Sequence, residues 1–147
     1  MNVRFKTKES ALARALQKKW LDVFFVKLEN LQMAGVPDLL LAKGGRTYFV
    51  ELKSCIEPKK ESSQLLKYGL NQMQLNFFLE FKRKGNFGFL LILTDKRLIL
   101  LNSKNCDFDL INKASLKDIL NYADFECLLN NQNCYNLLKE RIFENEI

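Results

Sequence analysis

The 147-residue sequence contains no histidine. Without an imidazole, Ser-His and Cys-His catalysis and a histidine general base are excluded. Its four cysteines (Cys55, Cys106, Cys127 and Cys134) show no Cys-x-x-Cys spacing, so a zinc site would need all four scattered thiolates. Free, reduced cysteines are therefore expected. Any chemistry must depend on carboxylates, lysines or a metal ion.

Long apolar segments are also missing. No apolar run approaches the roughly 20 residues of a membrane span, and the N-terminal stretch MNVRFKTKES lacks the apolar core of a signal peptide. The chain shows no internal repeat and no low-complexity linker. These absences predict one domain in the cytoplasm, without a membrane partner.

The charge is uneven along the chain. The net charge is +6 at pH 7, but the first 102 residues hold 18 Lys and Arg against 9 Asp and Glu, whereas the last 45 hold 5 against 8. A basic body attracts polyanions, of which nucleic acid is the commonest. Simple solubility explains the same charge, so charge alone leaves both readings open.

Apolar periodicity and turn residues predict an α/β (α+β) fold in the order helix, three strands, helix, two strands and C-terminal helices. We expect a central mixed sheet of about four to five strands, flanked by helices. The predicted elements are a helix capped by Thr7 or Ser10 and carrying Leu12, Leu16 and Trp20 on one face, strands at 23–29, 37–43 and 46–54, a helix from Asn71 closed by Gly85, strands at 87–93 and 97–102, and helices from Ser115 and over 135–143.

Gly44-Gly45 lies between two of these strand runs and predicts a two-residue hairpin. Lys43 then faces Arg46, and every cross-strand pair has position numbers that sum to 89. Asp38 and Glu51 would be direct neighbours on one face, with Cβ atoms roughly 4.5–5.5 Å apart. Lys53 lies two residues beyond Glu51 and shares that face.

Two carboxylates facing each other on a sheet repel, so one must stay protonated or a cation must lie between them. Paired carboxylate oxygens suit Mg²⁺, and Lys53 could partly neutralise the pair or polarise a bound water. The alternative is that Asp38 caps a strand and that Glu51 and Lys53 form an exposed salt bridge. A slip of one residue in the turn would also separate the three side chains.

The stretch GVPDLLLAKGGRTYFVELKS resembles the core motif of the PD-(D/E)XK nuclease superfamily, which is Pro-Asp, a spacer and Glu-x-Lys. Together with the later LNQMQLNFFLEFKRKGNFGFLLIL, it is most similar to the virus-type replication-repair nuclease (VRR-NUC) group. The resemblance covers about Glu9 to Leu101. It implies a restriction-endonuclease-like core over residues 1–102. Nothing after about Ser103 matches the family, and we expect 103–147 to be a C-terminal helical extension packed on the same domain, with a dimerisation element or a lid as alternatives. The resemblance also implies Mg²⁺- or Mn²⁺-dependent cleavage of DNA phosphodiesters.

The resemblance assigns roles to individual residues. It implies that Asp38, Glu51 and the backbone carbonyl of Leu52 ligate the metal, and that Lys53 positions or activates the attacking water. Glu9 matches an acid on the family's first helix, although it could merely favour the helix dipole. Gln74 matches the family's glutamine, although with Asn71 it also has the spacing of a capping box.

Three lysines in the polar stretch after Lys53 (Lys59, Lys60 and Lys67) are candidates for phosphate contacts, against the alternative of a solvated loop. No helix-turn-helix or zinc motif is present to read bases, so selectivity would come from DNA shape. We expect an endodeoxyribonuclease acting on duplex or branched DNA such as Holliday junctions, as a homodimer if both strands are cut symmetrically. The alternative is a catalytically silent module of the same fold that binds DNA or protein. The abundance of lysine and asparagine suggests a low-GC virus or phage, which would place the protein in the host cytoplasm.

Overall fold

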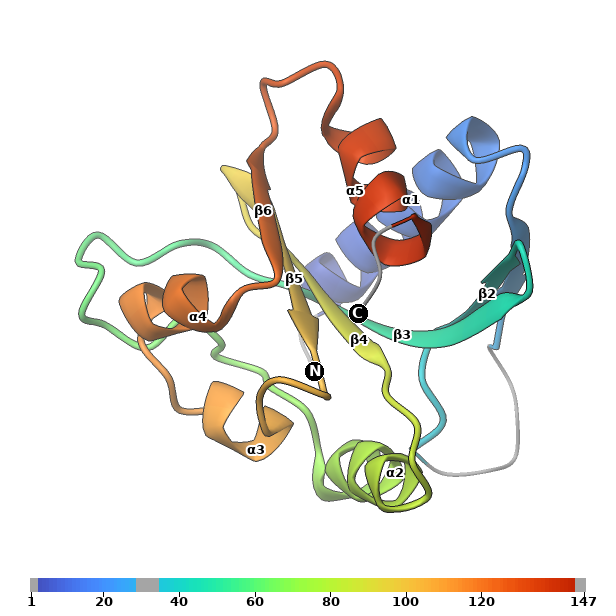
Figure 1. Cartoon of the computed structure of the whole chain (residues 1–147). Coiled ribbons are helices and arrows are strands. Elements are labelled where there is room, and N and C mark those ends of the chain that lie inside the picture. The colour runs from blue at the N-terminus through green and yellow to red at the C-terminus, as the bar shows by residue number, and fades with distance from the viewer. Residues whose placement is uncertain (1–2, 29–34, 145–147) are drawn as a thin grey trace.

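A single mixed sheet of six strands forms the centre of the protein (Figure 1). The computed structural model describes residues 3–28 and 35–144. β3 and β4 pair in parallel, because a helix carries the chain across between them, and the other neighbouring strands pair in antiparallel fashion. In sheet order, which is also chain order, the strands are β1 (Phe24–Lys27), β2 (Leu39–Lys43), β3 (Arg46–Ser54), β4 (Phe89–Leu93), β5 (Arg97–Asn102) and β6 (Phe125–Leu128).

Helices cover both faces of the sheet, which gives three layers (Figure 1). One face is covered by α1 (Val3–Lys19) and α5 (Cys134–Phe143). The other face is covered by α2 (Gln72–Arg83), α3 (Phe108–Ile111) and α4 (Leu116–Tyr122). No helix in the described ranges is long and apolar enough to cross a membrane.

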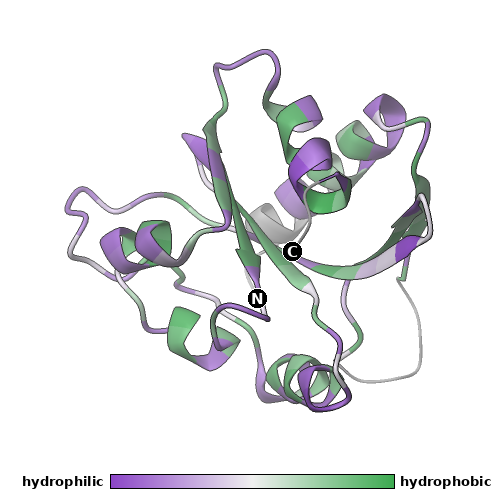
Figure 2. Ribbon diagram, in the orientation of Figure 1, coloured by the Kyte–Doolittle hydropathy of each residue, from purple (hydrophilic) through white to green (hydrophobic). Residues whose placement is uncertain are grey.

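The neighbouring strands β4 and β5 are buried on both faces. Phe89 and Leu91 pack in the core beneath α1 and α5, whereas Leu90 and Ile92 pack in the core beneath α2, α3 and α4. This double burial explains why these strands are continuous apolar runs instead of alternating with polar residues. Figure 2 shows hydrophobic colouring along most of both strands.

The predicted α+β class and the order of elements through β5 are confirmed. The sheet has six strands, however, and not the four to five that we predicted. The additional strand is β6, in a region predicted to be helical only. Its four residues, FECL, are too few to produce a clear alternating pattern.

Two smaller expectations concern the first helix and the cysteines. The first helix begins at Val3, so Thr7 and Ser10 lie inside it and do not cap it. Arg4 and Lys6, which have high helix propensity, are consistent with a helix that begins before the predicted start. All four cysteines are free, as expected, and all four are buried.

The hairpin between β2 and β3 has the predicted register. Lys43 pairs with Arg46 and Leu39 pairs with Val50, so the paired positions sum to 89. Gly44 and Gly45 have φ angles of 60° and 81°, as a type I′ turn requires. Continuing this register by one residue places Asp38 opposite Glu51, directly before β2 begins.

The last 45 residues are integrated into the fold. β6 extends the sheet beside β5, and α5 packs beside α1 on the first face. Two long-range hydrogen bonds hold α5 in place: Trp20 Nε1 donates to the Tyr135 carbonyl at 3.0 Å, and Arg46 Nη1 donates to the Phe143 carbonyl at 2.6 Å. The predicted C-terminal extension therefore completes the core that the first 102 residues begin.

Candidate functional site

Within the described residues, the last residues of β3 have no strand partner on the side of β2, because β2 begins only at Leu39. Carboxylates occupy this free edge. Asp38 Oδ2 accepts a hydrogen bond from the Leu52 N–H at 2.8 Å, and Glu9 Oε2 accepts from both the N–H and the hydroxyl of Ser54 at 3.1 Å. Alternate N–H groups of a strand point to the same side, so Asp38 and Glu9 lie along one edge. The structure thus brings these two predicted acids to the same place.

Glu51 and Lys53 are buried beside this edge. Glu51 is 2% exposed and Lys53 is 5% exposed, and Lys53 Nζ lies 3.5 Å from Glu51 Oε2. The predicted convergence of Asp38, Glu51 and Lys53 is therefore observed. The alternative of an exposed salt bridge is wrong, because hydrophobic strands and α2 bury this pair.

The second carboxylate oxygen of Glu51 is not satisfied. Glu51 Oε1 is buried and accepts no hydrogen bond from any residue that the structure describes. Its acidic neighbour Asp38 can share a hydrogen bond with Glu51 only when one of the two carries a proton. A buried acceptor without a donor costs free energy, so the site favours either a proton or a cation at this position.

The electrostatics of the site agree with this requirement. Burial raises the pKa of Glu51 well above its usual value, and the nearby Asp38 raises it further, against the opposing charge of Lys53. Burial also raises the pKa of Glu9, with Lys53 and Ser54 opposing and Asp38 adding to the rise. The three acids therefore form one interacting group around a single ammonium.

The oxygen atoms at this edge fit a divalent cation. A strand residue directs its N–H and C=O to the same side, so the Leu52 carbonyl points toward the side on which Asp38 bonds the Leu52 N–H. In residues 3–28 and 35–144, no three His, Cys, Asp or Glu side chains are arranged as a ready metal cage. A magnesium site does not require one, since Mg²⁺ takes one or two carboxylates and completes its shell with water and phosphate oxygens.

Gln74 forms the predicted capping box and also contacts the carboxylate site. Its Oε1 accepts from the Asn71 N–H at 3.0 Å and its N–H donates to Asn71 Oδ1 at 2.9 Å, which completes a capping box. Its Nε2 donates to Glu51 Oε2 at 2.9 Å. One amide can do both because it carries an acceptor and two donors. Gln74 therefore fixes the start of α2 against Glu51.

The contact of Ser54 with the site and the packing of Gly35 beside it were not predicted. Ser54 donates twice to Glu9, and strand alternation after Lys53 could have placed it on the side of α1. Gly35 has a φ of 83°, and a Cβ there would collide with the Met73 carbonyl oxygen in the first turn of α2. The sequence shows a glycine before Pro37-Asp38 but gives no sign that it packs against α2.

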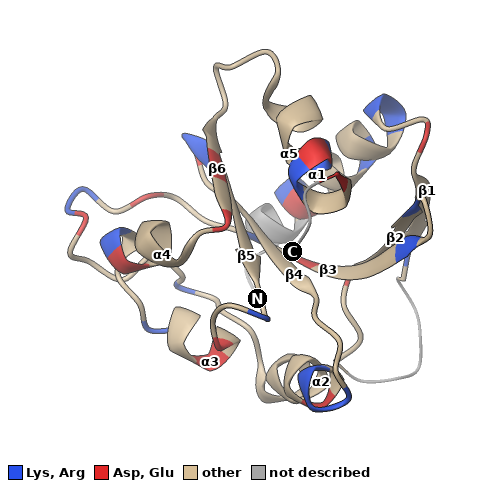
Figure 3. Ribbon diagram, in the orientation of Figure 1, with Lys and Arg blue, Asp and Glu red and all other residues tan. Residues whose placement is uncertain are grey.

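The candidate DNA-contacting lysines lie farther out. Lys59, Lys60 and Lys67 are exposed in the loop between β3 and α2. Backbone hydrogen bonds from Leu116 to Ser63 and from Lys117 to Glu61 tie this loop to α4. Figure 3 shows basic residues at the outer tip of the loop, beyond α4. Their contact with phosphate stays a prediction.

Replacing Glu51 with glutamine is expected to stabilise the metal-free protein at neutral pH. In the folded state Glu51 keeps its proton at pH values above its ordinary pKa of 4.5. The stability that the protonated Glu51 gives the wild-type fold is therefore fully present below pH 4.5 and is lost as pH rises through the raised pKa. The loss is at most about 1.4 kcal/mol per pH unit for one proton. Urea unfolding of both proteins in a chelator, from pH 5 to 8, measures the difference.

The exposed Glu61 provides the matched control, as Glu61→Gln. The free energy of unfolding of Glu51→Gln minus that of wild type should increase with pH, whereas the Glu61→Gln difference should stay flat. A flat difference for both variants would show that Glu51 is ionised in the folded protein throughout this range.

Similarity to known proteins does not identify the chain. No family model matches the chain, and no curated protein is significantly similar to it. The function must therefore be inferred from the arrangement of Asp38, Glu51, Lys53 and Glu9 itself.

Proposed function

We propose that this protein is a metal-dependent endodeoxyribonuclease that hydrolyses DNA phosphodiester bonds. One observation carries the proposal: Glu51 is buried opposite Asp38 with an unsatisfied carboxylate oxygen, and the Lys53 ammonium lies 3.5 Å from its other oxygen. A purely structural cluster would be expected to satisfy each buried oxygen. An oxygen left without a donor, beside a second acid, suits a cation that arrives with its substrate.

Each residue has a role that follows from its position. Asp38, Glu51 and the Leu52 carbonyl would hold Mg²⁺ or Mn²⁺, with Glu9 as a further oxygen donor at the same edge. When bound, the metal neutralises charge on the phosphate and makes water a better nucleophile. Lys53 would orient the attacking water and stabilise negative charge that develops on the phosphate oxygens. Gln74 would keep Glu51 directed at the site.

The proposed fold is a restriction-endonuclease-like core, supported by the order α1-β1-β2-β3-α2-β4-β5 and by the position of Asp38 directly before β2 and of Glu51 on β3. The substrate is inferred from charge: the first 102 residues carry 18 basic against 9 acidic residues. We infer recognition of DNA structure, such as a branch or four-way junction, instead of base sequence. Symmetrical cutting of a junction would require a homodimer with two sites.

A cleavage panel tests this function. Duplex, single-stranded, flap and four-way DNA are each incubated with the protein in Mg²⁺, Mn²⁺ or EDTA. We expect cleavage in Mg²⁺ or Mn²⁺, none in EDTA, and the highest rate on branched DNA. Cleavage that continues in EDTA would contradict the metal role. Tight DNA binding without cleavage in either metal would favour the silent binding module.

A further inference from the structure

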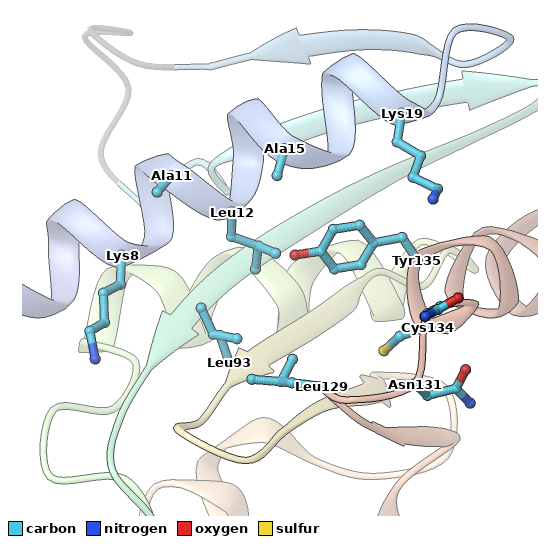
Figure 4. Close-up of a pocket in the computed structure, with 11 residues that line it drawn as sticks. Lys8, Ala11, Leu12, Ala15, Lys19, Leu93, Leu129, Asn131, Cys134 and Tyr135 are labelled. Carbon is cyan, nitrogen blue, oxygen red and sulfur yellow. The ribbon is translucent and has the colours of Figure 1, made fainter.

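A pocket of about 680 Å³ lies between α1 and the segment that joins β6 to α5 (Figure 4). Its floor is apolar, with Leu12 from α1, Leu93 from β4 and Leu129 after β6. The ring of Tyr135, in the first turn of α5, lies across it. The Tyr135 carbonyl accepts the Trp20 indole N–H, which fixes this part of α5. The pocket is therefore large enough for an organic ligand and has one aromatic wall.

The hollow exists because α1 presents small side chains there. Ala11 and Ala15 line the pocket at positions where a larger residue would fill it. They are four residues apart and so lie on one face of the helix, beside Leu12. The apolar face of α1 thus packs against the sheet through its large residues and leaves this strip uncovered.

Lysines lie at both ends of this strip. Lys8 and Lys19 line the pocket and are eleven residues apart, which is three helical turns and about 16 Å along α1. No ion pair within the described ranges involves either lysine. Two amides, Asn131 and Gln132, lie at the rim. A ligand that fits has apolar flat groups, hydrogen-bonding edges and several negative charges along its length.

The pocket begins beside the carboxylate site. Leu93 in its floor pairs with Ser54 across the parallel ladder, and Ser54 donates to Glu9. Neighbouring strands lie about 4.8 Å apart, so the floor starts one strand away from the Glu9 contact. Lys8 adjoins Glu9 in α1. The pocket lies on the α1 face of the sheet, whereas Glu51 and Lys53 pair with Leu90 and Ile92 on the α2 face. A polymer would therefore reach the pocket from the carboxylate site by passing around the sheet edge at Glu9.

We propose that this pocket binds a short single-stranded arm of the DNA substrate, next to the site of cleavage. Unpaired bases have flat apolar faces that stack on aromatic rings, and their edges bond amides. The span between the lysines corresponds to about four or five stacked nucleotides at about 3.4 Å each, with phosphates at both ends. The inference rests on the proposed function, because the carboxylate site and the pocket would bind parts of the same DNA. An arm-binding pocket would account for the proposed preference for branched over blunt duplex DNA.

The test compares DNA binding by wild type and two pocket variants. Ala15→Leu fills the pocket without changing charge, and Lys8→Ala/Lys19→Ala removes the two cations. Fluorescence anisotropy in EDTA measures affinity for a blunt duplex and for the same duplex with a five-nucleotide arm at either the 5′ or the 3′ end. Both variants should bind one armed duplex about tenfold more weakly than wild type, with blunt-duplex affinity changed less than twofold.

The control is Lys104→Ala/Lys113→Ala, which removes two exposed lysines away from the pocket and should leave all affinities unchanged. A second probe is the aromatic anion anilinonaphthalene sulfonate, which should bind wild type, be displaced by oligo(dT), and bind Ala15→Leu weakly. An equal loss for armed and blunt duplexes would overturn the inference. So would dye binding in the pocket that oligo(dT) does not displace.

These outcomes separate the inference from the proposed function. If wild type cuts branched DNA but the pocket variants keep full affinity for the arms, the inference fails and the nuclease remains. If the arm-specific loss is found but no substrate is cut in any metal, the pocket is a single-strand binding site and the nuclease proposal fails.

Discussion

Replacing Lys53 with alanine is expected to reduce DNA cleavage by about 100- to 1,000-fold while DNA affinity changes less than about twofold. The ammonium lies 3.5 Å from Glu51 and the Lys53 residue is 5% exposed, so we expect it to add little to ground-state binding of the DNA backbone. Its contribution should come when negative charge develops on the phosphate. The loss should therefore fall on kcat, because that charge is greatest in the transition state.

Single-turnover cleavage and anisotropy binding on the same branched DNA measure the two quantities. Lys53→Met keeps most of the buried volume without the charge and should lose as much activity as Lys53→Ala. The exposed Lys113 provides the control, since Lys113→Ala should cleave at the wild-type rate. Thermal unfolding checks that each variant is folded. Wild-type cleavage by a folded Lys53→Met protein would rule out the proposed role of the ammonium.

Removing residues 103–147 is expected to abolish cooperative folding. The deleted segment supplies side chains to both cores, with Leu138 and Ile142 beneath the first layer of helices and Ile111 and Ile119 beneath the second, each at most 1% exposed. Fully burying one such side chain contributes about 1.5–3 kcal/mol. The loss of several would exceed the net stability of about 5–15 kcal/mol that is typical of a domain.

Circular dichroism and thermal unfolding of a chain that ends at Asn102 measure this effect. The thermal unfolding curve of this fragment is expected to lack a cooperative transition. Without β6, the edge of β5 is exposed and favours aggregation. A chain that ends at Glu144 serves as the control and should unfold like the full protein. A soluble, cooperatively folding 1–102 fragment would show instead that the first 102 residues are an independent domain.

Local rules explain what could be predicted about the site. The Gly44-Gly45 turn fixed the register of the hairpin, because a two-residue loop allows one pairing of the flanking strands. That register places Asp38 opposite Glu51. The capping box of α2 was also predictable, since Asn71 and Gln74 interact within a single helical turn.

Contacts between distant segments were harder to predict. The bonds from Ser54 to Glu9 and from Gln74 to Glu51 join residues 45 and 23 positions apart. The four residues of β6 gain their strand conformation from pairing with β5, not from their own pattern. The pocket between α1 and α5 likewise depends on how two helices at opposite ends of the chain pack.

By itself, the sequence determined the hairpin, its register and the meeting of two acids with a lysine, because turn chemistry and strand alternation act over a few residues. Only the tertiary structure decided that Glu51 is buried with an oxygen unsatisfied, and that its pKa is therefore raised. Burial and desolvation depend on every layer that packs around a side chain. The local pattern thus located the candidate site, and the packing of α2 and the strands around it set its electrostatics.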